Sequence, residues 1–211
     1  AHEYFHVWNV KRIRPQGLGP FDYSGENYTP LLWMMEGFTG YYDTLIPVRA
    51  GLMTVPRYFE VIAERIAALK QTPGRHVRSL ESSSFDAWIK LYRPDENTIN
   101  TAVSYYLKGE LAAWLMDLSI RRQTEGERSL DDVMRLLWDR QQQTGEGIDP
   151  ADVDALFREA TGVTLDKEIQ AWTREVSDLP FDEELKQVGL SLKGSWKKTH
   201  DRSRIDGGKD K

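Results

Sequence analysis

The residues best suited to chemistry stand at the start of the chain, where His2, Glu3 and His6 form the pattern H-E-x-x-H. On a helix, residues four apart share one face, so both imidazoles can reach a single metal ion. Zinc in a hydrolase usually takes three protein ligands and keeps a fourth position for water. Because the 211 residues include only four histidines, a chance match to this pattern would be rare. The pattern therefore predicts a zinc site.

Glu36 is the candidate third ligand, since a carboxylate from a second helix often completes such a site. It lies in the apolar run Trp33-Met34-Met35-Glu36-Gly37-Phe38, where burial without a partner would be costly. Glu3 is placed to take a proton from a metal-bound water during attack on a carbonyl. Asp43 follows Glu36 by two helical turns and is a candidate to orient a ligand histidine, although a solvated helix-end position explains it equally well.

Several segments together resemble the glycyl aminopeptidase family of zinc metallopeptidases. The resemblance implies a gluzincin enzyme, in which the third zinc ligand is a glutamate, here Glu36. It also implies a preference for peptides with small N-terminal residues such as Gly or Ala. The matching segments are HEYFHVWNVKRIRP (2–15), PFDY (20–23), LWMMEGFTGYY (32–42), YYLKG (105–109) and SLDDVM (129–134).

Tyr106 belongs to a Y-x-K-G element, in which the resemblance implies a tyrosine hydroxyl that donates a hydrogen bond to the tetrahedral oxyanion. A phenol of pKa about 10 stays protonated at neutral pH and can serve as such a donor. Many tyrosines simply pack in a core, however. Tyr105 and Tyr106 lie about 100° apart on a helix, so we expect at most one of them to face the metal.

Helical patterns run through nearly the whole sequence, and we expect a mainly α protein, a multi-helix bundle with little or no sheet. Residues 1–190 are expected to form the helical lobe of a thermolysin-like catalytic domain, followed by a flexible basic tail at 191–211. The expected helices, from apolar periodicity, caps and Pro or Gly breaks, cover residues 1–12, 31–45, 56–70, 79–88, 98–124, 129–143, 149–160, 164–177 and 181–188.

Composition narrows the other possibilities. The net charge of −5, with acids and bases interleaved, leaves no basic groove for nucleic acid. No apolar run approaches the roughly 20 residues of a membrane span, so we expect a soluble protein without membrane partners. The absence of cysteine removes one marker of secretion, and both a cytoplasmic and a periplasmic location stay open.

The family that the chain resembles carries segments that this sequence does not contain. They are an N-terminal β-rich domain, the sheet half of the thermolysin-like fold with its Gly-Gly-x-Glu-His element, and a C-terminal PDZ domain. We therefore expect a fragment of a zinc aminopeptidase that acts on peptides, in which the fragment alone could be inactive. A thermolysin-type zinc endopeptidase and a catalytically inactive helical interaction module are the alternatives.

Overall fold

The computed structural model describes residues 1–193, and this part of the chain is built from helices without any β-strand. The mainly α prediction is therefore confirmed. The predicted tail, 191–211, lies outside the described residues from position 194 onward. No helix within residues 1–193 is both long and apolar enough to cross a membrane. The α-helices are α1 (His2–Phe5), α2 (Leu32–Arg49), α3 (Val55–Lys70), α4 (Leu80–Phe85), α5 (Thr98–Thr101), α6 (Tyr105–Gln123), α7 (Leu130–Thr144), α8 (Val153–Thr161), α9 (Asp166–Ile169) and α10 (Phe181–Gln187). Short 3-10 segments are η1 (Gln16–Leu18), η2 (Pro73–His76) and η3 (Pro150–Asp152), and η4 (Gln170–Arg174) is π-helical.

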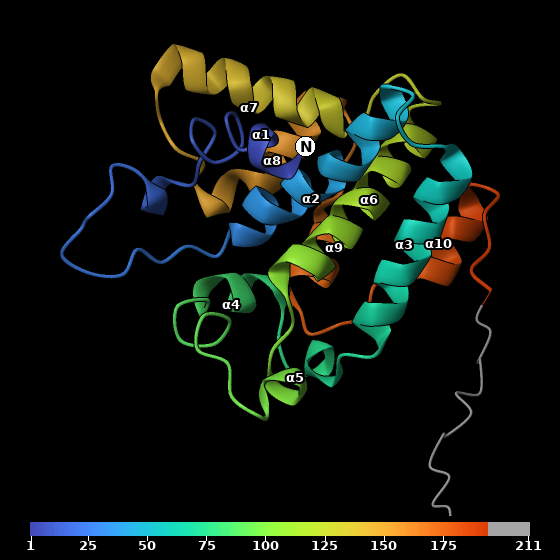
Figure 1. The fold of residues 1–211 in the computed structure, drawn as a ribbon. Helices are drawn as coiled ribbons and strands as arrows, with labels where there is room; N and C mark the ends of the chain where they lie inside the picture. Colours follow the sequence, from blue (N-terminus) through green and yellow to red (C-terminus); the bar gives the residue numbers. More distant parts are fainter. Residues whose placement is uncertain (194–211) are drawn as a thin grey trace, which may run out of the picture.

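The crossing of α2 and α6 forms the centre of the molecule and is its most extensive helix–helix interface (Figure 1). Two glycines allow the helix backbones to touch. A Cβ atom added at Gly37 would lie 2.4 Å from the carbonyl carbon of Gly109, and one added at Gly109 would lie 2.8 Å from the carbonyl oxygen of Trp33. This close approach brings the segment around Glu36 next to the first turns of α6.

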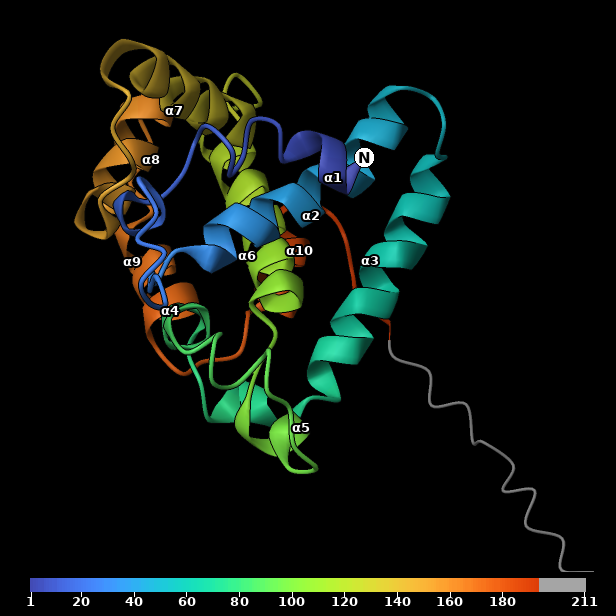
Figure 2. The ribbon, with the colours of Figure 1, turned by 60° about the vertical axis from the view of Figure 1, so that its left-hand side comes forward.

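The other helices surround this crossed pair. α7 packs on α8 at one end, while α3 contacts both central helices and α10 contacts α6 (Figures 1 and 2). α3 buries Ile62, Ile66 and Leu69 at helical spacing and leaves its charged face in solvent, which is the pattern expected of a helix that covers a core. α1 lies over α2 at the surface.

Two predicted helices differ from the structure in ways that matter for the site. The first ends at Phe5 rather than near Arg12, because the next amides of Val7 and Trp8 bond three residues back and Val10 then takes a non-helical backbone with φ of 159°. The predicted helix 98–124 is divided by an extended segment, and α6 begins only after Ser104, whose hydroxyl accepts a hydrogen bond from the amide of Leu107.

The remaining boundaries differ less, with two exceptions. α2 continues to Arg49 with Pro47 inside it, and the predicted helix 164–177 is the short α9 followed by the π-helical η4. Ser79 and Ser129 cap α4 and α7 through their side chains. Thr29 does not cap α2 directly, but its hydroxyl accepts a hydrogen bond from the amide of Leu31, one residue before the helix.

Candidate metal centre

Three side chains from two distant segments meet at one point. His2 Nε2 lies 3.1 Å from His6 Nε2 and 3.3 Å from Glu36 Oε2, and His6 Nε2 lies 3.2 Å from Glu36 Oε2. Within residues 1–193, this is the one group of three or more His, Cys, Asp or Glu side chains close enough to share a metal ion. The structure thus brings together the three residues that the sequence predicts as metal ligands.

The size of this triangle fits a zinc ion. In a tetrahedral site with zinc–ligand bonds of about 2.0–2.1 Å, two ligand atoms lie roughly 3.3 Å apart. The three distances here are 3.1, 3.2 and 3.3 Å. The side chains of His2, His6 and Glu36 are 27, 12 and 16 % exposed, so the group is sheltered yet open to solvent on one side.

The second ring nitrogens determine where the imidazole protons lie. His6 Nδ1 donates to the main-chain carbonyl of Asn9 at 2.7 Å, and a carbonyl can only accept. His2 Nδ1 donates to Asp43 Oδ2 at 3.3 Å. In the neutral rings, both Nε2 atoms therefore present lone pairs toward the carboxylate of Glu36. Three converging electron pairs repel one another, and a bound cation removes that repulsion.

Asn9 is a residue of the site that the sequence analysis missed. Its side chain is fully buried, and its Nδ2 donates to the carbonyl of Met35 at 2.8 Å and to Thr39 Oγ1 at 3.2 Å. Asn9 thus attaches the segment after α1 to α2 while its own carbonyl orients His6. Its position three residues after His6 is a weak indication that it contacts the histidine. We missed this indication because we expected an unbroken helix through residue 12.

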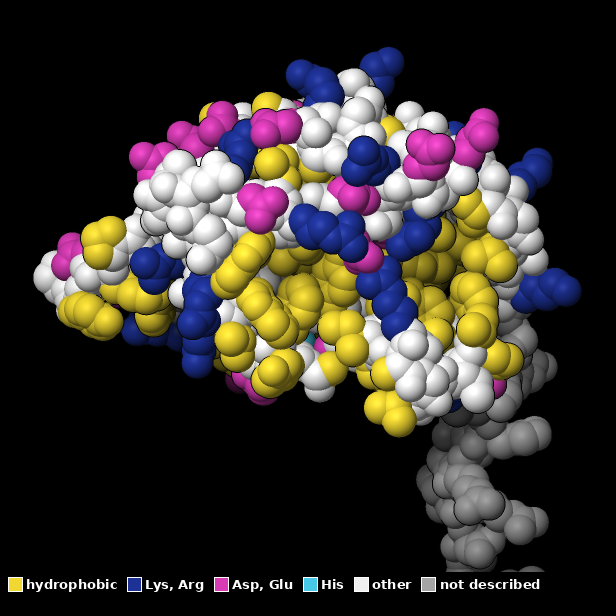
Figure 3. Space-filling model, turned by 90° about the horizontal axis from the view of Figure 1, so that it is seen from above, with side chains coloured by type: hydrophobic (Ala, Val, Ile, Leu, Met, Phe, Trp, Pro, Cys, Tyr) yellow, Lys and Arg dark blue, Asp and Glu magenta, His cyan; other side chains and the backbone are white. Residues whose placement is uncertain are grey.

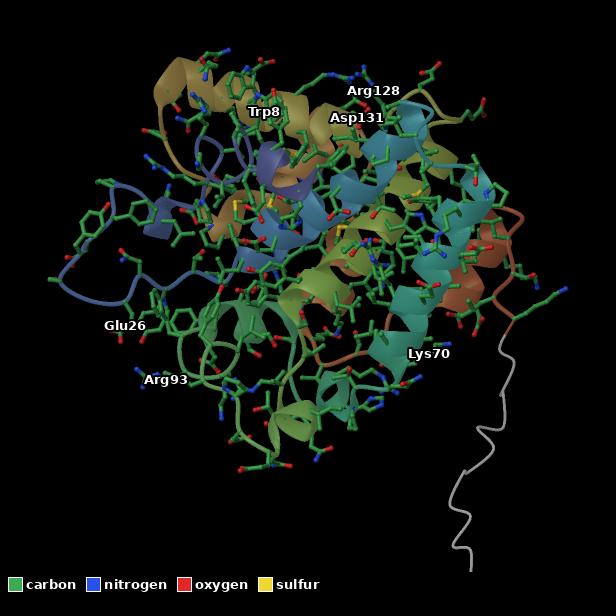
Figure 4. The ribbon with its side chains drawn as sticks, in the orientation of Figure 1. Trp8, Glu26, Lys70, Arg93, Arg128 and Asp131 are labelled. Carbon is green, nitrogen blue, oxygen red and sulfur yellow. The ribbon has the colours of Figure 1, made fainter. Side chains whose placement is uncertain are left out.

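A second contact ties α1 down. The ring of Phe5 stacks on that of Tyr42, with centroids 4.7 Å apart and planes at 20°. The Tyr42 hydroxyl donates to Asp131 of α7 at 2.8 Å, and Asp131 also pairs with Arg49. Figure 4 shows Asp131 at one end of α7 and Trp8 beside the same helix. A four-residue helix that would fray alone is therefore held by its packing.

The surface beside α1 is apolar. A groove of about 370 Å³ is lined by residues of the α1 segment and of α7. Seen from above, hydrophobic side chains gather across the centre of this face, with basic and acidic side chains both among them and around them (Figure 3). The lining residues are Phe5, Trp8, Ile13, Met134, Arg135, Trp138 and Asp139.

Three more predicted site residues stand on the helices that carry or adjoin this group. Glu3 stands in the first turn of α1 with an exposed side chain, between the two histidines in sequence. Tyr106 stands in the first turn of α6, and its ring lies 6.5 Å from that of His2 with planes at 28°. Asp43 holds His2 from α2 and also accepts a hydrogen bond from Thr44 Oγ1 at 2.8 Å.

The hydroxyl of Tyr106 belongs to a cluster of three tyrosines. Tyr105 is buried and stacks on Tyr106, with centroids 4.8 Å apart, so Tyr106 is the more exposed of the two. The hydroxyl oxygen of Tyr92 lies 3.2 Å from that of Tyr105 and 3.5 Å from that of Tyr106. Burial, the contact with Tyr92 and the charge of Glu36 raise the pKa of Tyr106, which keeps its proton. Nothing in the sequence indicated Tyr92, since it lies in an irregular segment.

Comparisons with known proteins identify a family and a similar solved structure. Residues 1–112 match the family model of M61 glycyl aminopeptidase. The chain is also similar to the crystal structure of an aminopeptidase N family protein from Idiomarina loihiensis, with a TM-score of 0.84 and 32% sequence identity over 88% of this chain. It spans 32% of the length of that protein. The comparison with curated proteins found no match.

The fold and these similarities place the chain among aminopeptidase-like domains. The family model covers more than half of the sequence, and the chain belongs to the M61 glycyl aminopeptidase family. The resemblance drawn from the sequence motifs is thus confirmed.

Proposed function

We propose that this chain carries the metal-binding and catalytic residues of a zinc aminopeptidase. The observation that carries the proposal is the triangle of His2 Nε2, His6 Nε2 and Glu36 Oε2, whose edges fit tetrahedral zinc. Peptidase activity is supported by the family and by the similar aminopeptidase N family protein. When bound, zinc would polarise the substrate carbonyl and make a water molecule more acidic.

The side chains divide the remaining work. Glu3 accepts a proton from the attacking water and returns it to the leaving amine, a role suited to an exposed carboxylate next to the ligands. Tyr106 donates a hydrogen bond to the oxygen that gains negative charge, and its raised pKa keeps that donor in place. Asp43 and the carbonyl of Asn9 hold the two imidazoles in the tautomer that binds a metal.

The substrate in this proposal is a peptide with a free N-terminus, and a small first residue such as Gly or Ala is favoured by the family to which the chain belongs. The N-terminal β-rich domain and the PDZ domain expected from the family would be its partners within a longer protein. A zinc endopeptidase that uses the same ligands is the second candidate. Cleavage of free and N-acetylated peptides by the full-length enzyme separates the two, because only an endopeptidase accepts a blocked N-terminus.

Zinc stoichiometry and affinity test the proposal directly. We expect one zinc per chain by calorimetry and metal analysis, and a sharp loss of affinity in His6→Ala and Glu36→Ala. His76→Ala is the matched control, because His76 is exposed and lies in η2, away from the three ligands. A parent chain that binds no zinc, or variants that bind it as the parent does, would favour the inactive helical module instead.

A further inference from the structure

Arg65 of α3 connects the elements around the metal centre. Its Nη1 donates to Thr44 Oγ1 at 2.7 Å and pairs with the carboxylate of Glu110, and its Nη2 lies 3.7 Å from Asp43 Oδ1. Thr44 and Asp43 belong to α2, whereas Glu110 belongs to α6. One guanidinium group therefore joins three helices behind the ligands.

The two carboxylate oxygens of Asp43 contact different groups. Oδ2 accepts from His2 Nδ1, while Oδ1 faces Thr44 and the guanidinium of Arg65. Among the described residues, Arg65 is the one Lys or Arg that pairs with Asp43, and likewise with the nearly buried Glu110. Without Arg65, the carboxylate of Asp43 would keep Thr44 alone on its Oδ1 side and could rotate away from His2.

We propose that Arg65 is a positioning residue of the metal centre and that it acts through Asp43. It fixes the carboxylate so that Oδ2 meets His2 Nδ1, and this contact in turn directs His2 Nε2 toward His6 and Glu36. The planar fork of arginine presents separate nitrogens to Asp43 and Glu110, whereas lysine has one nitrogen at the end of a flexible chain and fixes neither carboxylate in the same geometry. The inference rests on the proposed function, because it gives Arg65 a role in positioning a ligand of the proposed zinc ion.

A double-mutant cycle on zinc affinity tests this chain of contacts. Loss of a group that orients a ligand typically weakens metal binding 10- to 100-fold, and we expect this for Asp43→Ala. Arg65→Met should weaken binding about tenfold, and Arg65→Lys less. Because Arg65 acts through Asp43, the double variant should bind zinc no more weakly than Asp43→Ala alone. Competition with a chromophoric chelator gives each Kd.

The controls separate positioning from general stability. Arg57→Met removes an exposed arginine of the same helix, which within residues 1–193 pairs with Glu60 and Glu64 rather than with Asp43, and should leave the zinc Kd unchanged. Thermal unfolding followed by circular dichroism shows whether each variant is folded. Arg65→Lys keeps the charge, so it supplies a folded comparison if Arg65→Met unfolds.

A second readout does not involve metal. NMR of the side-chain nitrogens in the metal-free chain should show His2 protonated at Nδ1 in the parent and a mixture of tautomers in Arg65→Met. An unchanged Kd and tautomer in a folded Arg65 variant would overturn this inference and leave the proposed function intact. Strictly additive effects of the two substitutions would also overturn it. Absence of zinc binding by the parent would overturn both proposals.

Discussion

Lys108 belongs to a motif that includes a candidate catalytic residue, but its own role is structural. It is the lysine of the Y-x-K-G element, yet its side chain is 1% exposed and turned toward the protein interior. Its Nζ donates to the carbonyl of Ser177 at 2.7 Å, which joins α6 to the segment before α10. Burial lowers the pKa of Lys108 to about 8, although the charge of Asp178 opposes the shift.

This buried amine gives the protein a specific dependence of stability on pH. The folded state has a lysine pKa of about 8 against an ordinary value of 10.5, so between these two values the unfolded chain binds more protons. Stability from this group therefore rises with pH through that window and is constant below it. Relative to Lys108→Met, the parent should gain up to about 1.4 kcal/mol per pH unit.

Urea unfolding at pH 7, 8, 9 and 9.5 measures this difference. Lys11→Met provides the control, since it removes a lysine that is exposed on the surface. Parallel stability curves for the parent and Lys108→Met would show that the Lys108 amine titrates alike in both states.

The residues of the site were predictable to different degrees. The positions of His2, His6 and Glu36 follow from helical spacing and from the cost of an acid in an apolar run, which are local properties. Tyr92 was not predictable and Asn9 was only weakly indicated, because their roles depend on contacts with the start of α6 and with α2. The tertiary structure alone brings these side chains together.

At the scale of elements, the crossing of α2 and α6 sets the distance between Glu36 and Tyr106. The contact depends on the missing side chain of Gly37, where a Cβ would overlap the main chain of Gly109. Main-chain atoms cannot rotate out of the way as a flexible side chain can. A substitution at this position must therefore move one helix relative to the other.

We expect Gly37→Ala to destabilise the protein by about 1–3 kcal/mol, the usual cost of overpacking. The better helix propensity of alanine, worth roughly 1 kcal/mol, offsets part of this cost. Urea unfolding of Gly37→Ala beside Gly25→Ala checks the prediction, because a Cβ at Gly25 meets nothing within 4 Å. Equal stability of both variants would mean that the helices can separate at no cost.

The helices themselves were largely predictable from apolar periodicity and caps. The division of residues 98–124 was not, because Ala102 and Val103 interrupt the helix without a glycine or proline to mark the break. Ser104 is a capping residue, yet a serine within a long apolar pattern is compatible with a helix interior. The break nevertheless decides that Tyr106 stands in a first turn.

At the scale of the whole molecule, the three candidate metal ligands come from α1 with its C-cap residue and from α2, and these two helices begin 30 residues apart in sequence. The first of these helices has only four residues. A metal ion held by His2, His6 and Glu36 would cross-link α1 to the central helix. A ligand that binds only the folded state stabilises a protein by an amount that grows with the logarithm of the ligand concentration relative to its Kd. The fold and the metal centre should therefore be thermodynamically coupled.

Zinc at about 100 times its Kd should raise the free energy of unfolding by about 2.7 kcal/mol. Urea unfolding with zinc and with excess EDTA measures the difference, and His6→Ala should lose most of it. A parent chain whose stability is the same in zinc and in EDTA would contradict the prediction.

The hydrogen bond between His6 and Asn9 has a consequence for how the site can change. Its acceptor is a main-chain carbonyl, which is present whichever amino acid occupies position 9. The acceptor for His2 is the side chain of Asp43, which one substitution can replace. The two imidazoles therefore differ in how substitution can affect them. Replacing a hydrogen-bond acceptor side chain can change metal affinity through His2, whereas the acceptor of His6 is a main-chain atom that no substitution removes.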